Sequence, residues 1–128
     1  LRDALRPQGR AALQVITIED AAFDAYRKSA DFIQTYIFPG GMLPSATAFL
    51  DSARRAGLSL INQARFGTHY ARTLGEWRQR FRAAWEGRLL PKGFDERFRR
   101  IWDYYLGYCE GGFRAGGIDV MQVALVRP

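Results

Sequence analysis

The sequence predicts an α/β fold, in which helices cover a small sheet. Hydrophobic residues make up 48% of the 128 residues, which is typical of a folded domain and not of a disordered chain. Three β-branched and largely apolar segments predict strands at about 11–18, 58–66 and 118–126. Apolar residues that recur at steps of three and four predict helices at about 45–56, 69–86 and 95–115.

The first strand follows a break in the chain. Residues 1–6 are interpreted as the last turns of a helix, which Pro7 and Gly9 end. Helix, turn and buried strand in this order favour parallel pairing in the sheet. In open α/β folds ligands gather beyond the carboxyl ends of strands, so Gln14 is a candidate site residue. The alternative is an amide that only satisfies backbone groups.

The next segment runs into a flexible loop. Residues 24–36 predict one or two short helices, and Phe38, Pro39 and Gly40 follow them. Apolar side chains before a glycine pair form either the wall or lid of an apolar site or a plain surface turn.

The two middle helices have clear ends and faces. Ser45 is a suitable N-cap and Gly57 a suitable residue after the C-cap of the helix at 45–56. The helix at 69–86 carries an aromatic stripe opposite several arginines, which suits a core face or a helix on a membrane surface. His69 is the only histidine. It is a candidate acid, base or polar contact, or a structural hydrogen-bonding residue.

The last helix carries the widest apolar stripe. Asp95 can cap its start, and Gly116 and Gly117 end it. Tyr105 lies within the stripe, where a buried hydroxyl needs a partner. It is therefore either a core tyrosine with a satisfied hydroxyl or a functional residue. Cys109, on the same face, is interpreted as a packing thiol.

Composition limits the function classes. The single cysteine excludes an internal disulfide and a cysteine-based zinc site, and no cofactor-binding or metal-ligating motif is recognisable. The net charge of +6 suits nucleic acid or anionic lipid, but no nucleic-acid motif accompanies it, so we expect no nucleic-acid partner. No signal peptide or membrane-spanning run is visible, which favours a cytoplasmic protein.

Several stretches together resemble the cyclopropane-fatty-acyl-phospholipid synthase family. The matching segments, in the family's order, are Tyr36–Ser45, Phe66–Leu74 with Trp77, Trp102–Glu110, Gly112–Arg114 and Gly117–Val123. The resemblance implies the C-terminal half of a class I (Rossmann-like) methyltransferase fold, with the last strand antiparallel and between its neighbours. Residues 1–128 would be the C-terminal portion of a single methyltransferase domain, which agrees with the missing initiator Met. The cofactor-binding N-terminal half would be absent.

The resemblance also implies the chemistry. Family members transfer a methyl(ene) group from S-adenosylmethionine to the double bond of an unsaturated phospholipid acyl chain, and bicarbonate acts as the base in cyclopropane formation. Tyr105 would hydrogen-bond the bicarbonate, and the backbone carbonyl of Ile16 would be a further contact. Gln14 stands where many members carry His. This leaves a cyclopropane, a methyl or a methylene product open.

The remaining expectations concern substrate and partners. Phe38, Pro39 and Gly40 would line the acyl pocket, and His69 and Tyr70 match a family pair near it. The fragment alone should be inactive, and its exposed sheet edge favours a homodimer or a strand-swapped dimer. The basic charge suits an anionic membrane surface at the inner face. The alternative function is a non-catalytic lipid-binding or membrane-docking module.

Overall fold

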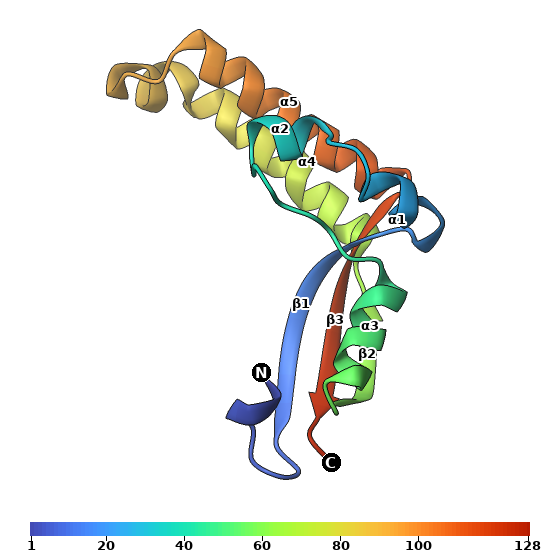
Figure 1. Cartoon of the computed structure of the whole chain (residues 1–128). Coiled ribbons are helices and arrows are strands. Elements are labelled where there is room, and N and C mark those ends of the chain that lie inside the picture. Colours follow the sequence, from blue (N-terminus) through green and yellow to red (C-terminus); the bar gives the residue numbers. More distant parts are fainter.

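A computed structural model describes all residues from 1 to 128, and its elements confirm the predicted α/β class (Figure 1). In chain order these are β1 (Arg10–Ile18), α1 (Asp20–Tyr26), α2 (Phe32–Tyr36), α3 (Ala46–Arg55), β2 (Ser59–Arg65), α4 (Gly67–Ala84), α5 (Glu96–Arg114) and β3 (Ile118–Val126). The expected helix end at 1–6 is only a one-turn 3-10 helix, Arg2–Ala4.

The sheet has the order β1-β3-β2, and both pairings are antiparallel. The parallel pairing predicted from the helix–turn–strand order is therefore wrong. The reason is that β3 returns after α5 and inserts between the two earlier strands, which run in the same direction without touching each other. The position of the last strand implied by the family resemblance is confirmed.

The two faces of the sheet are covered to different extents. On one face, α3 covers a cluster that includes Met121, Val123 and Leu125. On the other, the α4–α5 hairpin meets one end of the sheet and projects away from it (Figure 1). Consequently Gln14 and Gln122 are exposed on that second face. Although the strand segments are largely apolar in sequence, helices therefore do not cover the whole of both sheet faces.

The caps that the sequence predicted are present. Ser45 Oγ accepts a hydrogen bond from the N–H of Ala48 at 3.2 Å, and Asp95 Oδ1 accepts from that of Phe98 at 2.7 Å. Gly57, after α3, has φ +75°, a left-handed conformation that glycine adopts at no steric cost. These local signals fix where α3 and α5 begin and where α3 ends.

The start of α4 depends on a residue far away in the sequence. Asp119, on β3, accepts a hydrogen bond from the N–H of Gly67 at 2.7 Å. This explains why the helix begins two residues before the predicted position. At its other end α4 passes into a π-helical turn, Trp85–Leu89, and a 3-10 turn, Leu90–Lys92, which form the tip of the hairpin. No helix combines the length and apolar character that crossing a bilayer requires.

Candidate functional site

Tyr105 lies in an aromatic and aliphatic cluster where the α4–α5 hairpin meets the sheet. Its ring is 5.2 Å from that of Trp102 and 6.1 Å from that of Phe38, in an edge-on arrangement with Phe38. Ile16 and Tyr70 pack against the same buried core as Tyr105. Residues of β1, α4 and α5 thus pack against one core, and the loop after α2 meets it at Tyr105. We call Ile16, Phe38, Tyr70, Trp102 and Tyr105 the aromatic cluster.

The loop that carries Phe38 is tied down at both ends. Asp31 and Gln34 form a reciprocal capping box at the start of α2, with both hydrogen bonds at 2.9 Å. The Gln34 amide then donates to the carbonyl of Gly41 at 3.0 Å. Phe32 packs edge-on against Tyr104 of α5 at 4.6 Å. These contacts hold the loop against α5, although 55% of Phe38 itself is exposed.

Tyr105 and Cys109, which lie together on α5, stay uncharged near neutral pH. Burial, helped by the neighbouring Cys109 thiol, raises the pKa of Tyr105. Burial also raises the pKa of the Cys109 thiol to about 11. Tyr108 donates a long hydrogen bond of 3.4 Å to Asp31, whereas the Tyr105 hydroxyl has no oxygen or nitrogen partner in the chain. The Tyr105 hydroxyl is therefore neutral, and its side-chain partner is the weakly accepting Cys109 thiol.

The backbone of Ile16 faces the free edge of β1. The N–H of Ile18 donates outward to the carbonyl of Pro44, and that of Glu19 donates inward to Gly117. Because backbone groups along a strand alternate in direction, those of Ile16 point outward as those of Ile18 do. The carbonyl of Ile16 is thus directed away from β3.

The other sequence candidates lie outside the aromatic cluster. Gln14 is exposed, and its side-chain carbonyl accepts from the Gln122 amide at 3.0 Å, so its partner is a side chain and not backbone. It is two residues from Ile16 along β1, roughly 7 Å away. His69 is exposed in the first turn of α4, and Pro39 and Gly40 are exposed in their loop.

Sequence reasoning did not single out Trp102 as a neighbour of Tyr105. The signal was present, because Trp102 precedes Tyr105 by three residues on the same apolar stripe, where helical side chains meet. Ile33, on α2, also packs against the core under Tyr105. No periodicity links it to α5, so this contact could not be predicted.

Two surface depressions lie away from the aromatic cluster. One, of about 480 Å³, is lined mainly by charged residues of α4 and α5. The other, of about 340 Å³, lies between α3 and the sheet, with Leu50, Leu58 and Leu125 among its lining. Neither is lined by Tyr105. No group of three or more acidic, His or Cys side chains is placed to hold a metal ion.

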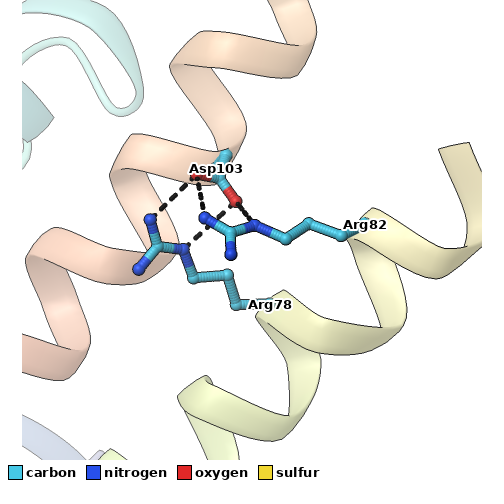
Figure 2. A network of polar contacts seen from close by, with 3 residues as sticks. All are labelled: Arg78, Arg82 and Asp103. Carbon is cyan, nitrogen blue, oxygen red and sulfur yellow. Dashed lines mark hydrogen bonds and ion pairs between the residues drawn. The ribbon is translucent and has the colours of Figure 1, made fainter.

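A second polar feature joins the two long helices (Figure 2). Asp103 of α5 accepts hydrogen bonds from both Arg78 and Arg82 of α4. The contacts of Arg78 measure 3.1 and 2.9 Å, and those of Arg82 measure 2.6 and 2.9 Å. Hydrogen bonds from Arg82 and then Arg78 hold the pKa of Asp103 well below its usual range. The carboxylate therefore stays charged and fixes both guanidinium groups.

Comparison with known proteins shows which proteins this chain is similar to. The family model described as mycolic acid cyclopropane synthetase matches residues 1–123. Tuberculostearic acid methyltransferase UfaA1 of Mycobacterium tuberculosis is 44% identical over 128 residues, covering 99% of this chain and 30% of the relative. Cyclopropane-fatty-acyl-phospholipid synthase of Escherichia coli is 38% identical over 96 residues, covering 75% of this chain and 24% of that protein.

Solved structures of proteins with similar names have a similar fold. The cyclopropane synthase MmaA2 from Mycobacterium tuberculosis superposes with a TM-score of 0.79 at 26% identity, over 98% of this chain and 46% of that one. The mycolic acid cyclopropane synthase CmaA1, complexed with SAH and CTAB, gives 0.77 at 29% identity, over 92% of this chain and 44% of that one. The chain thus spans less than half the length of each of these relatives.

Proposed function

Since this chain belongs to the mycolic acid cyclopropane synthetase family, we propose that the protein transfers a methyl or methylene group to the double bond of an unsaturated phospholipid acyl chain. The family consists of S-adenosylmethionine-dependent methyltransferases. The observation that carries the proposal for this chain is the aromatic cluster, in which the Tyr105 hydroxyl lies among apolar side chains with only the weakly accepting Cys109 thiol as a side-chain partner.

The chemistry requires a site of this kind. When bound, S-adenosylmethionine supplies an electrophilic methyl group. The acyl double bond would form a carbon–carbon bond to that methyl group as the bond from the methyl carbon to the sulfonium sulfur breaks, so that S-adenosylhomocysteine leaves and one acyl carbon becomes positively charged. A cation of this type needs a site without water, and aromatic faces stabilise it. Trp102 and Tyr105 provide such faces, with their rings 5.2 Å apart, and Tyr70 packs against the same buried core.

The residues of the aromatic cluster fit only the reacting end of the cofactor. Aromatic rings suit a sulfonium cation, but the cluster has no carboxylate for ribose hydroxyls or for an ammonium group. The N–H of Gly67, the glycine that follows β2, is already bonded to Asp119. We therefore assign the remainder of the cofactor site to segments outside this chain.

The proposal gives each residue of the cluster a role. Phe38 and Tyr70 hold the acyl chain and exclude water from it. The Tyr105 hydroxyl and the outward carbonyl of Ile16 hold a small polar group, such as bicarbonate, that takes the proton lost from the acyl cation. Tyr105 itself is not the base, because burial raises its pKa and keeps it protonated. In this role it is a hydrogen-bond donor.

The identity of the product depends on where that proton goes. Proton loss from the transferred methyl group with ring closure gives a cyclopropane, whereas loss of that proton with formation of a double bond gives a methylene branch. Gln14, bonded to Gln122, cannot accept a proton. The relative with 44% identity is named a methyltransferase. Because both products lose the same proton, Gln14 does not distinguish them, and it is the name of this relative that favours a branched product over a ring.

The direct test uses the full-length gene product with isotopically labelled S-adenosylmethionine and detergent-dispersed phosphatidylglycerol that carries one monounsaturated chain. We expect the label in the acyl chain, and chromatography against ring and branch standards identifies the product. The same lipid with fully saturated chains is the matched control and should stay unlabelled. Lipid binding without label transfer would instead support the non-catalytic lipid-binding module.

A further inference from the structure

We propose that the outer half of the α4–α5 hairpin, residues 78–103, docks the protein on anionic phospholipid membranes. The inference rests on the proposed function, because an enzyme that modifies phospholipid acyl chains must meet a lipid surface. It adds the part of the molecule that makes this contact. Figure 1 shows that the hairpin projects away from the sheet, so its tip can approach a surface without obstruction from this chain.

The tip of the hairpin exposes large apolar side chains around the turn between α4 and α5. Leu90 is 48% exposed and Phe94 is 38% exposed. Trp85, just before the tip, is 2% exposed, and the Arg99 guanidinium lies 5.5 Å from the centre of its ring. The turn is therefore anchored from inside while its apolar side chains face outward. Exposed apolar groups at a protruding tip are typical of interaction sites.

Positive charge is concentrated on the same half-hairpin. Residues 78–103 contain eight Arg and Lys against four Asp and Glu, a net charge of +4 out of +6 for the whole chain. Each Lys or Arg near an anionic bilayer contributes about 1 kcal/mol to binding. The charge thus gives this part of the molecule the strongest attraction to an anionic surface.

The depression of about 480 Å³ lies on this half-hairpin, and it can receive headgroup phosphates. Its lining includes Arg78, Arg82, Arg99 and Arg100. Asp103 fixes Arg78 and Arg82 (Figure 2) but neutralises only one of their two charges. Guanidinium groups held in place in this way suit phosphate oxygens, because their paired N–H donors match that geometry.

The spacing between the apolar tip and the arginines matches the depth of a membrane interface. Arg99 and Arg100 follow Phe94 by five and six residues, which along a helix is about 8 to 9 Å. Interfacial segments bury their apolar groups about 5 to 10 Å into the boundary between headgroups and acyl chains. With Phe94 at that boundary, the arginines lie at the level of the phosphates. Nucleic acid would use the arginines but would leave the apolar tip in water.

The test measures binding of the full-length gene product to sedimented vesicles, either phosphatidylglycerol mixed with phosphatidylcholine or phosphatidylcholine alone. Leu90→Glu places a charge at the tip, and Arg100→Gln removes an arginine that makes no ion pair in the chain. Their matched controls are Leu60→Glu, at a leucine of β2 that is 46% exposed, and Arg55→Gln on α3. Lipid-free melting temperatures show that each variant folds.

We expect wild type to prefer anionic vesicles. Leu90→Glu should weaken this binding about tenfold, and Arg100→Gln should weaken it about fivefold, while the controls stay within twofold of wild type. Equal effects of each variant and its control would overturn the proposal. So would a Leu90→Glu melting temperature several degrees below that of Leu60→Glu, because another part of the protein would then cover the tip. Tighter binding to an oligonucleotide than to vesicles at matched salt would overturn it as well.

Wild-type methyl transfer to detergent-dispersed lipid separates this proposal from the proposed function. If methyl transfer occurs and the hairpin variants bind vesicles as tightly as wild type does, only the docking surface is refuted. Vesicle binding that depends on the hairpin, without any transfer, refutes the proposed reaction and leaves the docking surface supported.

Discussion

Replacing Asp103 by Asn removes the carboxylate that joins α4 to α5, and we expect the outer half of the hairpin to open more often. The Asp103 side chain is 23% exposed and that of Arg78 is 31% exposed, so their bidentate pair is partly shielded from water. A charged hydrogen-bonded pair contributes about 1.5 to 3 kcal/mol when buried. Screening at this exposure reduces the contribution to about 1 kcal/mol. Asn also leaves two neighbouring guanidinium groups without their shared counter-charge.

The free energy of opening the outer half of the hairpin should fall by about 1 to 2 kcal/mol in Asp103→Asn. This corresponds to roughly 5- to 30-fold faster amide exchange in peptides from residues 76–104. Hydrogen exchange read by mass spectrometry measures this locally in the full-length gene product. Glu110→Gln is the matched control, because Glu110 is also a carboxylate of α5 but pairs with Arg114 on its own helix. Equal exchange in the two variants would refute the reasoning.

The pH dependence of this effect follows from the lowered pKa of Asp103. A carboxylate whose pKa is lower in the folded state stabilises the fold above its unfolded pKa. That contribution is lost only as the pH falls through the folded pKa. The difference between wild type and Asp103→Asn should therefore persist at pH 4, although an ordinary Asp, with a pKa of 3.8, is nearly half protonated there. A difference that halves near pH 4 would contradict the lowered pKa.

Two further predictions concern the base of the hairpin. Gly67→Ala places a Cβ about 2.7 Å from Asp119 Oδ1. We therefore expect the free energy of unfolding to fall by about 1 to 2 kcal/mol and amide exchange to become faster in the first turn of α4. The control Gly87→Ala, with no atom within 4 Å of its Cβ, should have little effect on either. Cys109, with its pKa raised to about 11, should be about 0.1% thiolate at pH 8 against roughly a quarter when unfolded. Alkylation of the Cys109 peptide should therefore be about two hundredfold faster in urea, and equal rates would contradict the burial.

The helices could be predicted from the sequence because their signals are local. Ser45 and Asp95 are followed by apolar residues at helical spacing, and each accepts the backbone hydrogen bond expected of a cap. The strand segments were also found from composition. Their pairing could not be found, because the order β1-β3-β2 depends on where β3 packs after a long hairpin. Only the resemblance to a known family placed the last strand between the others.

The candidate site shows the same division between local and distant contacts. Tyr105 was predicted from its position on an apolar stripe, and its neighbour Trp102 lies within one helical turn of it. The partners of Gln14 and Asp103 could not be predicted, because Gln122 is 108 residues from Gln14 and Arg78 is 25 residues from Asp103. His69 lies outside the aromatic cluster, because α4 turns it toward solvent.

Turnover of Tyr105→Phe in the full-length gene product tests the central claim most directly. Tyr108→Phe is the matched control, because it removes a hydroxyl from the same helix that makes only the long contact with Asp31. With labelled S-adenosylmethionine and detergent-dispersed unsaturated phospholipid, we expect Tyr105→Phe to lower kcat at least tenfold, as loss of one hydrogen bond to a charged group predicts. Its melting temperature should stay close to that of wild type, and Tyr108→Phe should keep wild-type turnover. Wild-type kcat in Tyr105→Phe would show that the hydroxyl has no part in the reaction.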